Sequence, residues 1–124
     1  METVTCYNHI VDSANDVYEK LGGGLSESIY QTALAVALRE LGHVVEAELV
    51  VPIIYKNQYV GFVRPDLVIN KEVVLELKSV SKIVETHIVQ LRAYQRWLPR
   101  NGGNDMVPGA VINFGPTYVE VRPV

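Results

Sequence analysis

The chain has 124 residues, of which 48% are hydrophobic and 20% charged, proportions that exclude a disordered protein and suffice for one domain with a core. The net charge of −3 argues against a broad nucleic-acid-binding surface, so any phosphate binding would be local. No apolar run approaches the roughly 20 residues of a membrane span, and the N-terminus lacks a signal-peptide pattern. Cys6 is the single cysteine, so we expect an intracellular, reducing environment rather than secretion.

Two helices are predicted in the first third of the chain. Residues 9–21 place apolar side chains at helical spacing, and the glycines at 22–24 end this helix because glycine readily adopts the left-handed conformation. Ser26 can cap a second helix, which Gly42 closes. The two apolar stripes consist of Ile10, Ala14, Val17 and Leu21, and of Tyr30, Ala33, Leu34, Ala37, Leu38 and Leu41.

Glu27 lies in the first turn of the second predicted helix, one turn before Tyr30, and leans toward the apolar stripe. An acid in this position gains about 0.3–1 kcal/mol from the helix macrodipole. This structural role is a sufficient explanation for Glu27 on helix rules alone.

Two strands are predicted to follow. Residues 44–55 alternate apolar and acidic side chains, which indicates one long strand, and a polar turn at 56–58 brings the chain back along residues 59–69. Pro65 cannot donate a hydrogen bond to a neighbouring strand, so we expect a bulge or an unpaired stretch there. Bulges often re-aim a side chain next to an active site, and the side chain concerned here is that of Asp66.

The third predicted strand, residues 72–80, follows a second polar turn. If that turn holds three residues, Val68 lies opposite Val74 and Asp66 lies opposite Glu76, because side chains alternate along a strand. A two-residue turn would make the two acids near-diagonal neighbours instead.

Two carboxylates that face each other repel, and an unpaired buried charge is unfavourable, so something positive should lie between Asp66 and Glu76. Lys78, two residues beyond Glu76, is one candidate, and a divalent cation with oxygen ligands is the other. The alternative interpretation is a surface salt-bridge patch, although the flanking residues are apolar on both faces.

A third helix is predicted at residues 84–98, with His87, Gln90 and Tyr94 in an i, i+3, i+7 row. The stretch from Lys78 to Arg100 is locally basic, with five bases and one acid. The bases are Lys78, Lys82, Arg92, Arg96 and Arg100, and the acid is Glu85. The three arginines follow i, i+4 spacing and form either a ridge that tracks phosphates or a solvated helix face.

The chain ends with two predicted strands, residues 107–114 and 118–122, after a glycine-containing loop. The element order α-α-β-β-β-α-β-β predicts an α/β fold in which a three-stranded meander continues through a helical crossover into a mixed sheet flanked by helices. We expect one domain spanning residues 1–124. The helices should bury Leu67, Ile69, Leu75 and Leu77.

Gly24-Leu25-Ser26-Glu27-Ser28-Ile29-Tyr30 resembles the signature of the small GxxExxY proteins. Further motifs of these proteins follow in the expected order over nearly the whole chain. They are Tyr55-Lys56, Arg64-x-Asp66, Glu76-Leu77-Lys78, His87-x-x-Gln90-Leu91-x-x-Tyr94 and Ile112-Asn113-Phe114-Gly115. GxxExxY proteins resemble members of the PD-(D/E)XK nuclease-like superfamily, which implies a restriction-endonuclease-like core of order α-β-β-β-α-β.

The resemblance also implies an activity, the metal-dependent hydrolysis of phosphodiester bonds in nucleic acid. It implies that Asp66 and Glu76 hold Mg²⁺ or Mn²⁺, with Glu27 as the helical acid that this superfamily often adds to the metal site. Lys78 would orient or help deprotonate the attacking water and stabilise the developing charge.

The same resemblance assigns roles on the third helix. Gln90 and Tyr94 resemble the Q-x-x-x-Y element, which helps to position metal-site groups or substrate. His87 belongs to the family pattern, and its role, in chemistry or in packing, stays open. From the local basic density, and not from the resemblance, Lys82, Arg92 and Arg96 are expected to bind substrate.

The expected partner is nucleic acid, with DNA ahead of RNA, and the expected location is the cytoplasm or wherever that nucleic acid resides. No membrane partner is expected, and the sequence leaves a homodimer open. Two other functions fit the same residues. One is a non-catalytic nuclease-like module that binds nucleic acid or a protein partner, and the other is a structural or regulatory interaction protein.

Overall fold

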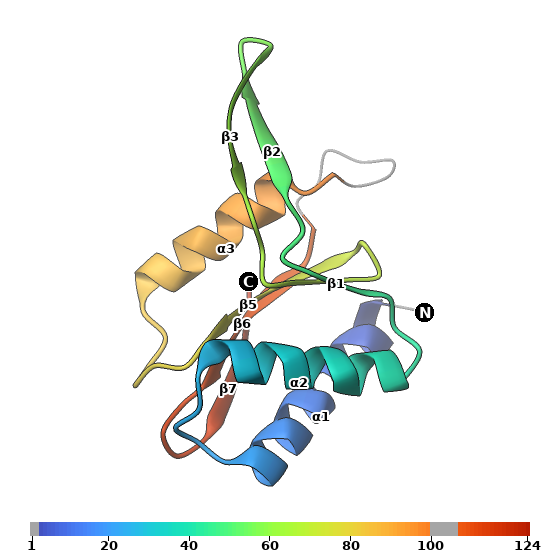
Figure 1. Ribbon diagram of the computed structural model, residues 1–124, viewed down its shortest axis with the longest axis vertical. Helices are drawn as coiled ribbons and strands as arrows, with labels where there is room; N and C mark the ends of the chain where they lie inside the picture. The colour runs from blue at the N-terminus through green and yellow to red at the C-terminus, as the bar shows by residue number, and fades with distance from the viewer. Residues whose placement is uncertain (1–2, 100–106) are drawn as a thin grey trace.

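The computed structural model describes residues 3–99 and 107–124, and Figure 1 shows their arrangement. The elements are α1 (Thr3–Leu21), α2 (Glu27–Glu40), β1 (Val45–Ala47), β2 (Val51–Tyr55), β3 (Gln58–Val63), β4 (Leu67–Ile69), β5 (Val73–Lys78), α3 (Glu85–Trp97), β6 (Gly109–Phe114) and β7 (Val119–Pro123). None of the described helices is both long enough and apolar enough to cross a membrane.

Five strands form a mixed sheet in the order β1-β4-β5-β6-β7. Strands β5 and β6 run parallel and are joined through α3, whereas the other neighbours are antiparallel. Helices α1 and α2 lie on one face of this sheet and α3 lies on the other (Figure 1). The predicted mixed sheet flanked by helices, with a helical crossover between β5 and β6, is confirmed.

Each face of the sheet has its own apolar cluster because side chains alternate along the strands. On the face of α1 and α2, the four residues predicted to be buried are inaccessible to solvent; they are Leu67, Ile69, Leu75 and Leu77. On the face of α3, Val68, Val74 and Val111 pack with Leu91 and Tyr94 of the helix. Glu76 is two residues beyond Val74 and therefore faces the same side of the sheet, so its carboxylate lies beneath α3.

The strand predicted at residues 44–55 is in fact two strands, β1 and β2, which belong to different sheets. The chain turns between them where Glu48 adopts a left-handed conformation with φ of 54°. The strand predicted at 59–69 is likewise divided into β3 and β4, and residues 64–66 between them are unpaired, as the proline at 65 led us to expect. Strands β2 and β3 pair only with each other, as a hairpin that projects from the molecule (Figure 1).

The two polar turns form where they were predicted. Lys56 and Asn57 have φ of 48° and 62° in the β2–β3 turn. In the β4–β5 hairpin, Ile69 pairs with Val73 and Val68 pairs with Val74, which confirms the three-residue turn and excludes the two-residue alternative.

The helices differ from the predictions mainly at their ends. Helix α1 begins at Thr3 rather than at residue 9, and α3 covers Glu85–Trp97, close to the predicted 84–98. Leu21 and Leu41 were assigned to apolar stripes but are 43% and 46% exposed. Each lies at the C-terminal end of its helix, where the helix extends beyond the cluster that its earlier turns bury.

Candidate active site

Asp66 is fixed beside β5 by two hydrogen bonds. Its Oδ2 accepts a hydrogen bond from the backbone N–H of Leu77 at 2.7 Å, and its backbone carbonyl accepts one from Glu48 at 3.0 Å. The second bond comes from the residue at which β1 ends and the chain turns toward β2. The break in the predicted long strand therefore helps to position the carboxylate.

Glu76 is the buried acid of the site. It lies in β5, is only 3% exposed, and has Oε1 at 3.4 Å from Nζ of Lys78. Its Oε2 is buried and has no hydrogen-bond partner among the described residues. Most buried polar atoms in proteins are paired, so an orphaned carboxylate oxygen indicates a group that the protein chain does not itself supply.

Burial and the neighbouring charge of Asp66 raise the pKa of Glu76 to about 7. The neighbouring Asp66 carboxyl raises this pKa, whereas the Lys78 ammonium and the nearby Tyr94 hydroxyl lower it. The single positive charge of Lys78 therefore does not balance the negative charges of Asp66 and Glu76.

The donor set fits a divalent cation. Two carboxylates side by side, one with an unpaired buried oxygen, are the hard oxygen ligands that Mg²⁺ and Mn²⁺ prefer, and Mg²⁺ is commonly bound through one or two carboxylates. Within residues 3–99 and 107–124, no three histidine, cysteine, aspartate or glutamate side chains gather closely enough to hold a metal ion by themselves. Glu27 therefore does not join Asp66 and Glu76 in one cluster.

Two residues of α3 complete the wall opposite β5. Tyr94 is buried against Glu76, and burial together with the charges on Glu76 and Asp66 raises the pKa of its phenol. Tyr94 therefore stays protonated and acts as a hydrogen-bond donor. Gln90, one turn earlier, is exposed and lowers the pKa of Tyr94 through a side-chain hydrogen bond. Gln90 and Tyr94 are therefore neighbours on α3, and of the two it is Tyr94 that packs toward Glu76.

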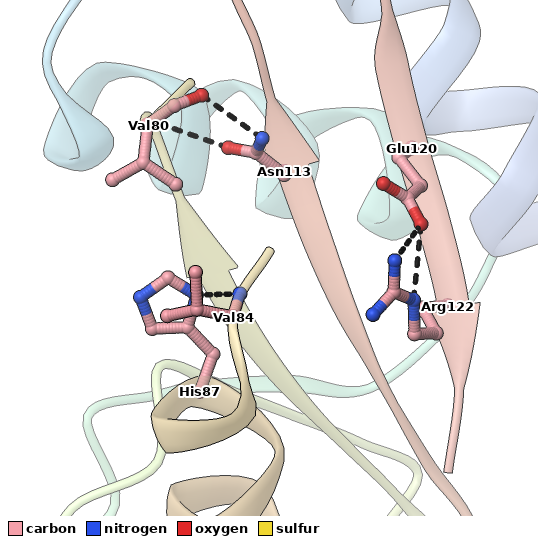
Figure 2. A network of polar contacts seen from close by, with 6 residues as sticks. All are labelled: Val80, Val84, His87, Asn113, Glu120 and Arg122. Atoms are coloured by element: carbon pink, nitrogen blue, oxygen red, sulfur yellow. Dashed lines mark hydrogen bonds and ion pairs between the residues drawn. The ribbon is translucent and has the colours of Figure 1, made fainter. Parts of the chain in front are cut away.

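His87 has a local structural contact. Its Nδ1 accepts a hydrogen bond from the backbone N–H of Val84 at 3.2 Å, which caps the start of α3 (Figure 2). Burial and the charge of Lys78 lower the pKa of His87, and the charge of Glu27 raises it. His87 therefore caps the helix and also lies within electrostatic range of both Lys78 and Glu27.

Glu27 is exposed in the first turn of α2, and the motif around it is anchored by Tyr30. The buried Tyr30 hydroxyl donates to the Gly22 carbonyl at 2.5 Å and accepts from the Leu25 N–H at 3.2 Å. The Leu25 carbonyl in turn accepts from Ser79 Oγ at 2.9 Å. These bonds tie the loop before Glu27 to Ser79, the residue that follows Lys78.

Asn113 is a supporting residue to which the sequence analysis assigned no role. It lies opposite Lys78 in the β5–β6 pair and is 3% exposed. Its side chain accepts from the Val80 N–H and donates to the Val80 carbonyl, both at 3.0 Å (Figure 2). A buried amide in an otherwise apolar strand was the signal that could have revealed this clamp on the chain beyond Lys78.

The basic residues predicted to contact substrate lie on the surface. Lys82, Arg92 and Arg96 are exposed. Arg92 lines a hollow of about 550 Å³ between α3 and the ends of β6 and β7, and Asp66, Glu76 and Lys78 are not among its lining residues. Arg100, the last member of the predicted ridge, lies outside the described residues.

Comparison with known proteins gives one match. A family model described as the PD-(D/E)XK nuclease superfamily matches residues 5–123, nearly the whole chain. No curated protein matches the chain, and no solved structure matches it either.

Proposed function

This chain belongs to the PD-(D/E)XK nuclease superfamily and has a restriction-endonuclease-like mixed α/β fold, and on that premise we propose that it is a metal-dependent nuclease. Members of this superfamily are generally nucleases, and they typically use divalent metals. The reaction proposed is hydrolysis of phosphodiester bonds in nucleic acid, with DNA as the expected substrate ahead of RNA. The observation that carries the proposal is the partnerless, buried Oε2 of Glu76 beside Asp66.

In this proposal Asp66 and Glu76 hold Mg²⁺ or Mn²⁺. When bound, such a cation supplies polarisation of a phosphoryl oxygen and a lower pKa for its water. Asp66 is suited to the role because the Leu77 N–H fixes one of its oxygens. Glu76 is suited because its desolvated oxygen gains more from a cation than a hydrated carboxylate would.

Lys78 and Tyr94 act on the reacting groups from the protein side. The Lys78 ammonium, 3.4 Å from Glu76, supplies positive charge where a phosphate would approach and orients or helps deprotonate the attacking water. The Tyr94 hydroxyl lies beside Glu76 and Gln90 lies beside Tyr94, so in this proposal both serve as donors toward the site. Fixed donors of this kind need no reorganisation during the reaction.

The remaining candidates are assigned more peripheral roles. Glu27 would reach a cation through water, and His87 would keep the start of α3 in place beside it. Contacts to substrate phosphates further from the cleavage site are proposed for Lys82, Arg92 and Arg96. The motif from Gly24 to Tyr30 supports assignment to the GxxExxY proteins, with residues 1–124 as a single nuclease-like domain.

A cleavage assay tests the proposal. Single-stranded, double-stranded and branched substrates are incubated with Mg²⁺, with Mn²⁺ or with a chelator, using wild type, Asp66→Asn, Glu76→Gln and the control Glu72→Gln. Glu72 is an exposed acid in the β4–β5 turn and should be dispensable. We expect metal-dependent cleavage by wild type and the control only. Cleavage by either site variant at the wild-type rate, or binding of substrate by wild type with no cleavage under any condition, would contradict the proposal.

A further inference from the structure

The β2–β3 hairpin, residues 51–63, projects from the molecule (Figure 1). It carries exposed aromatic side chains. Tyr55, Tyr59 and Phe62 are 63%, 62% and 52% exposed. Aromatic groups this exposed are unfavourable in a protein that keeps them in water, and a free two-stranded hairpin is only marginally stable by itself. The hairpin therefore carries a feature that the fold does not require.

Two of the three exposed rings, those of Tyr59 and Phe62, lie on one face of this hairpin, and Tyr55 lies on the other. Pro52 pairs with Phe62 and Ile54 pairs with Tyr59, and cross-strand partners share a face. All four of these residues are exposed. The opposite face is anchored, because Val51 is buried in the cluster beneath α3. The result is a firmly attached ribbon whose outer face offers two aromatic rings.

The charge of the hairpin differs from that of the rest of the chain. Residues 49–65 contain two bases, Lys56 and Arg64, and no acid, whereas the whole chain has a net charge of −3. Neither base pairs with an acid among residues 3–99 and 107–124. Nζ of Lys56 lies 5.4 Å from the centre of the Tyr55 ring. Aromatic rings accompanied only by positive charge favour a polyanion with flat, stacking groups.

We propose that the hairpin binds an unpaired single strand of nucleic acid, with bases stacked on Tyr59 and Phe62 and phosphates beside Lys56 and Arg64. This inference rests on the proposed nuclease function and names the part of the substrate that the hairpin holds. The hairpin leads directly into the site, because only Pro65 separates Arg64 from Asp66. A strand on the hairpin would therefore continue toward the acid pair.

A second copy of the chain is a less suitable occupant of this face. Packing one hairpin face against another would bring the two bases of each copy together, with no acid in either hairpin to offset them. A nucleic-acid strand supplies a negative charge at every nucleotide and a flat apolar surface at every base.

Binding in the absence of cleavage tests the inference. Fluorescence anisotropy with a chelator present measures Kd for a labelled single strand of about 16 nucleotides and for a strand of about 4, the two ends of the usual range of site sizes. The variants are Tyr59→Ala/Phe62→Ala, the conservative Tyr59→Trp/Phe62→Trp and the charge reversal Lys56→Glu. Tyr118→Ala is the matched control, because Tyr118 is 63% exposed but lies in the β6–β7 turn.

We expect the double alanine variant to weaken binding of the longer strand at least about 25-fold, since loss of each of the two stacking rings typically weakens binding about fivefold or more. The tryptophan variant and Tyr118→Ala should bind as wild type does, and Lys56→Glu should weaken binding with a shallower salt dependence. The short strand should distinguish the variants less. Equal Kd values for wild type and the double alanine variant would overturn the inference, as would equal losses in Tyr118→Ala.

Light scattering on the same samples tests the competing occupant. If the double alanine variant converts a dimer to a monomer while Kd for the strand is unchanged, the face is an interface between copies and the inference fails. Its failure is distinguishable from that of the nuclease proposal. A hairpin-dependent Kd without any metal-dependent cleavage would refute only the nuclease, and cleavage that ignores the hairpin variants would refute only the strand-binding role.

Discussion

The two hairpins of this protein are consecutive in sequence and opposite in character. In the β4–β5 hairpin every strand residue from Leu67 to Ile69 and from Val73 to Leu77 is buried, including the acid Glu76. In the β2–β3 hairpin most residues are exposed, including three aromatic rings. The buried hairpin therefore contains a charged side chain in an apolar environment, and the exposed hairpin contains aromatic side chains in water.

This contrast separates what the fold needs from what function needs. A buried carboxylate weakens the fold unless a cation offsets it, and an exposed ring gains nothing until a partner covers it. The two hairpins that carry these features are connected by Arg64, Pro65 and Asp66.

The largest effect expected is the pH dependence that Glu76 imposes on stability. Its pKa is about 7 in the folded protein and about 4.5 in an unfolded chain, so the folded state binds more protons between these values than the unfolded chain does. The free energy of unfolding without metal should therefore fall as pH rises from about 4.5 to 7, by on the order of 3 kcal/mol, and then level off. Urea denaturation across this range with a chelator measures it.

Glu76→Gln should lack most of that decline, because the glutamine side chain does not titrate in this range. The exposed control Glu72→Gln should keep it. A wild-type protein whose stability rises steadily over the same pH range would contradict the placement of a desolvated carboxylate next to Asp66.

The next effect concerns the exit of the buried hairpin. Asn113→Ala removes both hydrogen bonds to Val80, leaving a backbone donor and acceptor unpaired, and should lower the free energy of unfolding by about 1–3 kcal/mol. The exposed Asn15→Ala, which loses a single bond within α1, is the control and should change it by less than about 0.5 kcal/mol. Equal effects would show that the clamp contributes nothing specific.

The turn of the same hairpin contains a pH-sensitive contact of opposite sign. Asn70 Oδ1 accepts from the Val44 N–H, so its amide nitrogen must face His43 Nδ1 at 2.9 Å, which disfavours a proton on that nitrogen. Burial and the neighbouring His9 lower the pKa of His43. The folded state therefore binds fewer protons below pH 6.5, and stability should fall as the pH drops through that region.

This decrease is best measured in the Glu76→Gln background, where the opposing titration is absent. His43→Gln in the same background should flatten the acid limb of the profile. If stability below pH 6.5 falls as much in this variant as without the substitution, protonation of His43 does not cost the fold stability.

The smallest effect expected lies in the exposed hairpin. Tyr59→Ala should change the free energy of unfolding by no more than about 0.5 kcal/mol, because the ring is 62% exposed and is not a member of either apolar cluster of the described residues. Thermal or urea unfolding measures this change. A large loss of stability would mean that the ring supports the fold, and the contrast between the two hairpins would then fail on this side.

Much of the fold follows from local patterns in the sequence. The facing of Val68 and Val74, and with it the approach of Asp66 to Glu76, follows from strand alternation and a three-residue turn. The crossover through α3 follows from helical periodicity between two apolar strands. These features depend on near neighbours in sequence, which is why they could be predicted.

The features that could not be predicted depend on contacts between distant segments. Alternation continues unbroken through Glu48, so nothing local marks the left-handed turn that sends β2 out of the main sheet. The clamp of Asn113 on Val80 and the network of His9, His43 and Asn70 join residues far apart in the chain. The orphaned Oε2 of Glu76 is likewise a consequence of packing by α3.

Calorimetric titration of Mn²⁺ tests the central claim, that Asp66 and Glu76 together hold a divalent cation. We expect one site per chain in wild type and in Glu72→Gln and none in Asp66→Asn or Glu76→Gln. Because Glu76 has a pKa of about 7, binding near pH 6 should also release a proton, seen as a dependence of the heat on the buffer. Mn²⁺ binding that survives in Glu76→Gln with unchanged affinity, or that is absent from wild type, would contradict the claim.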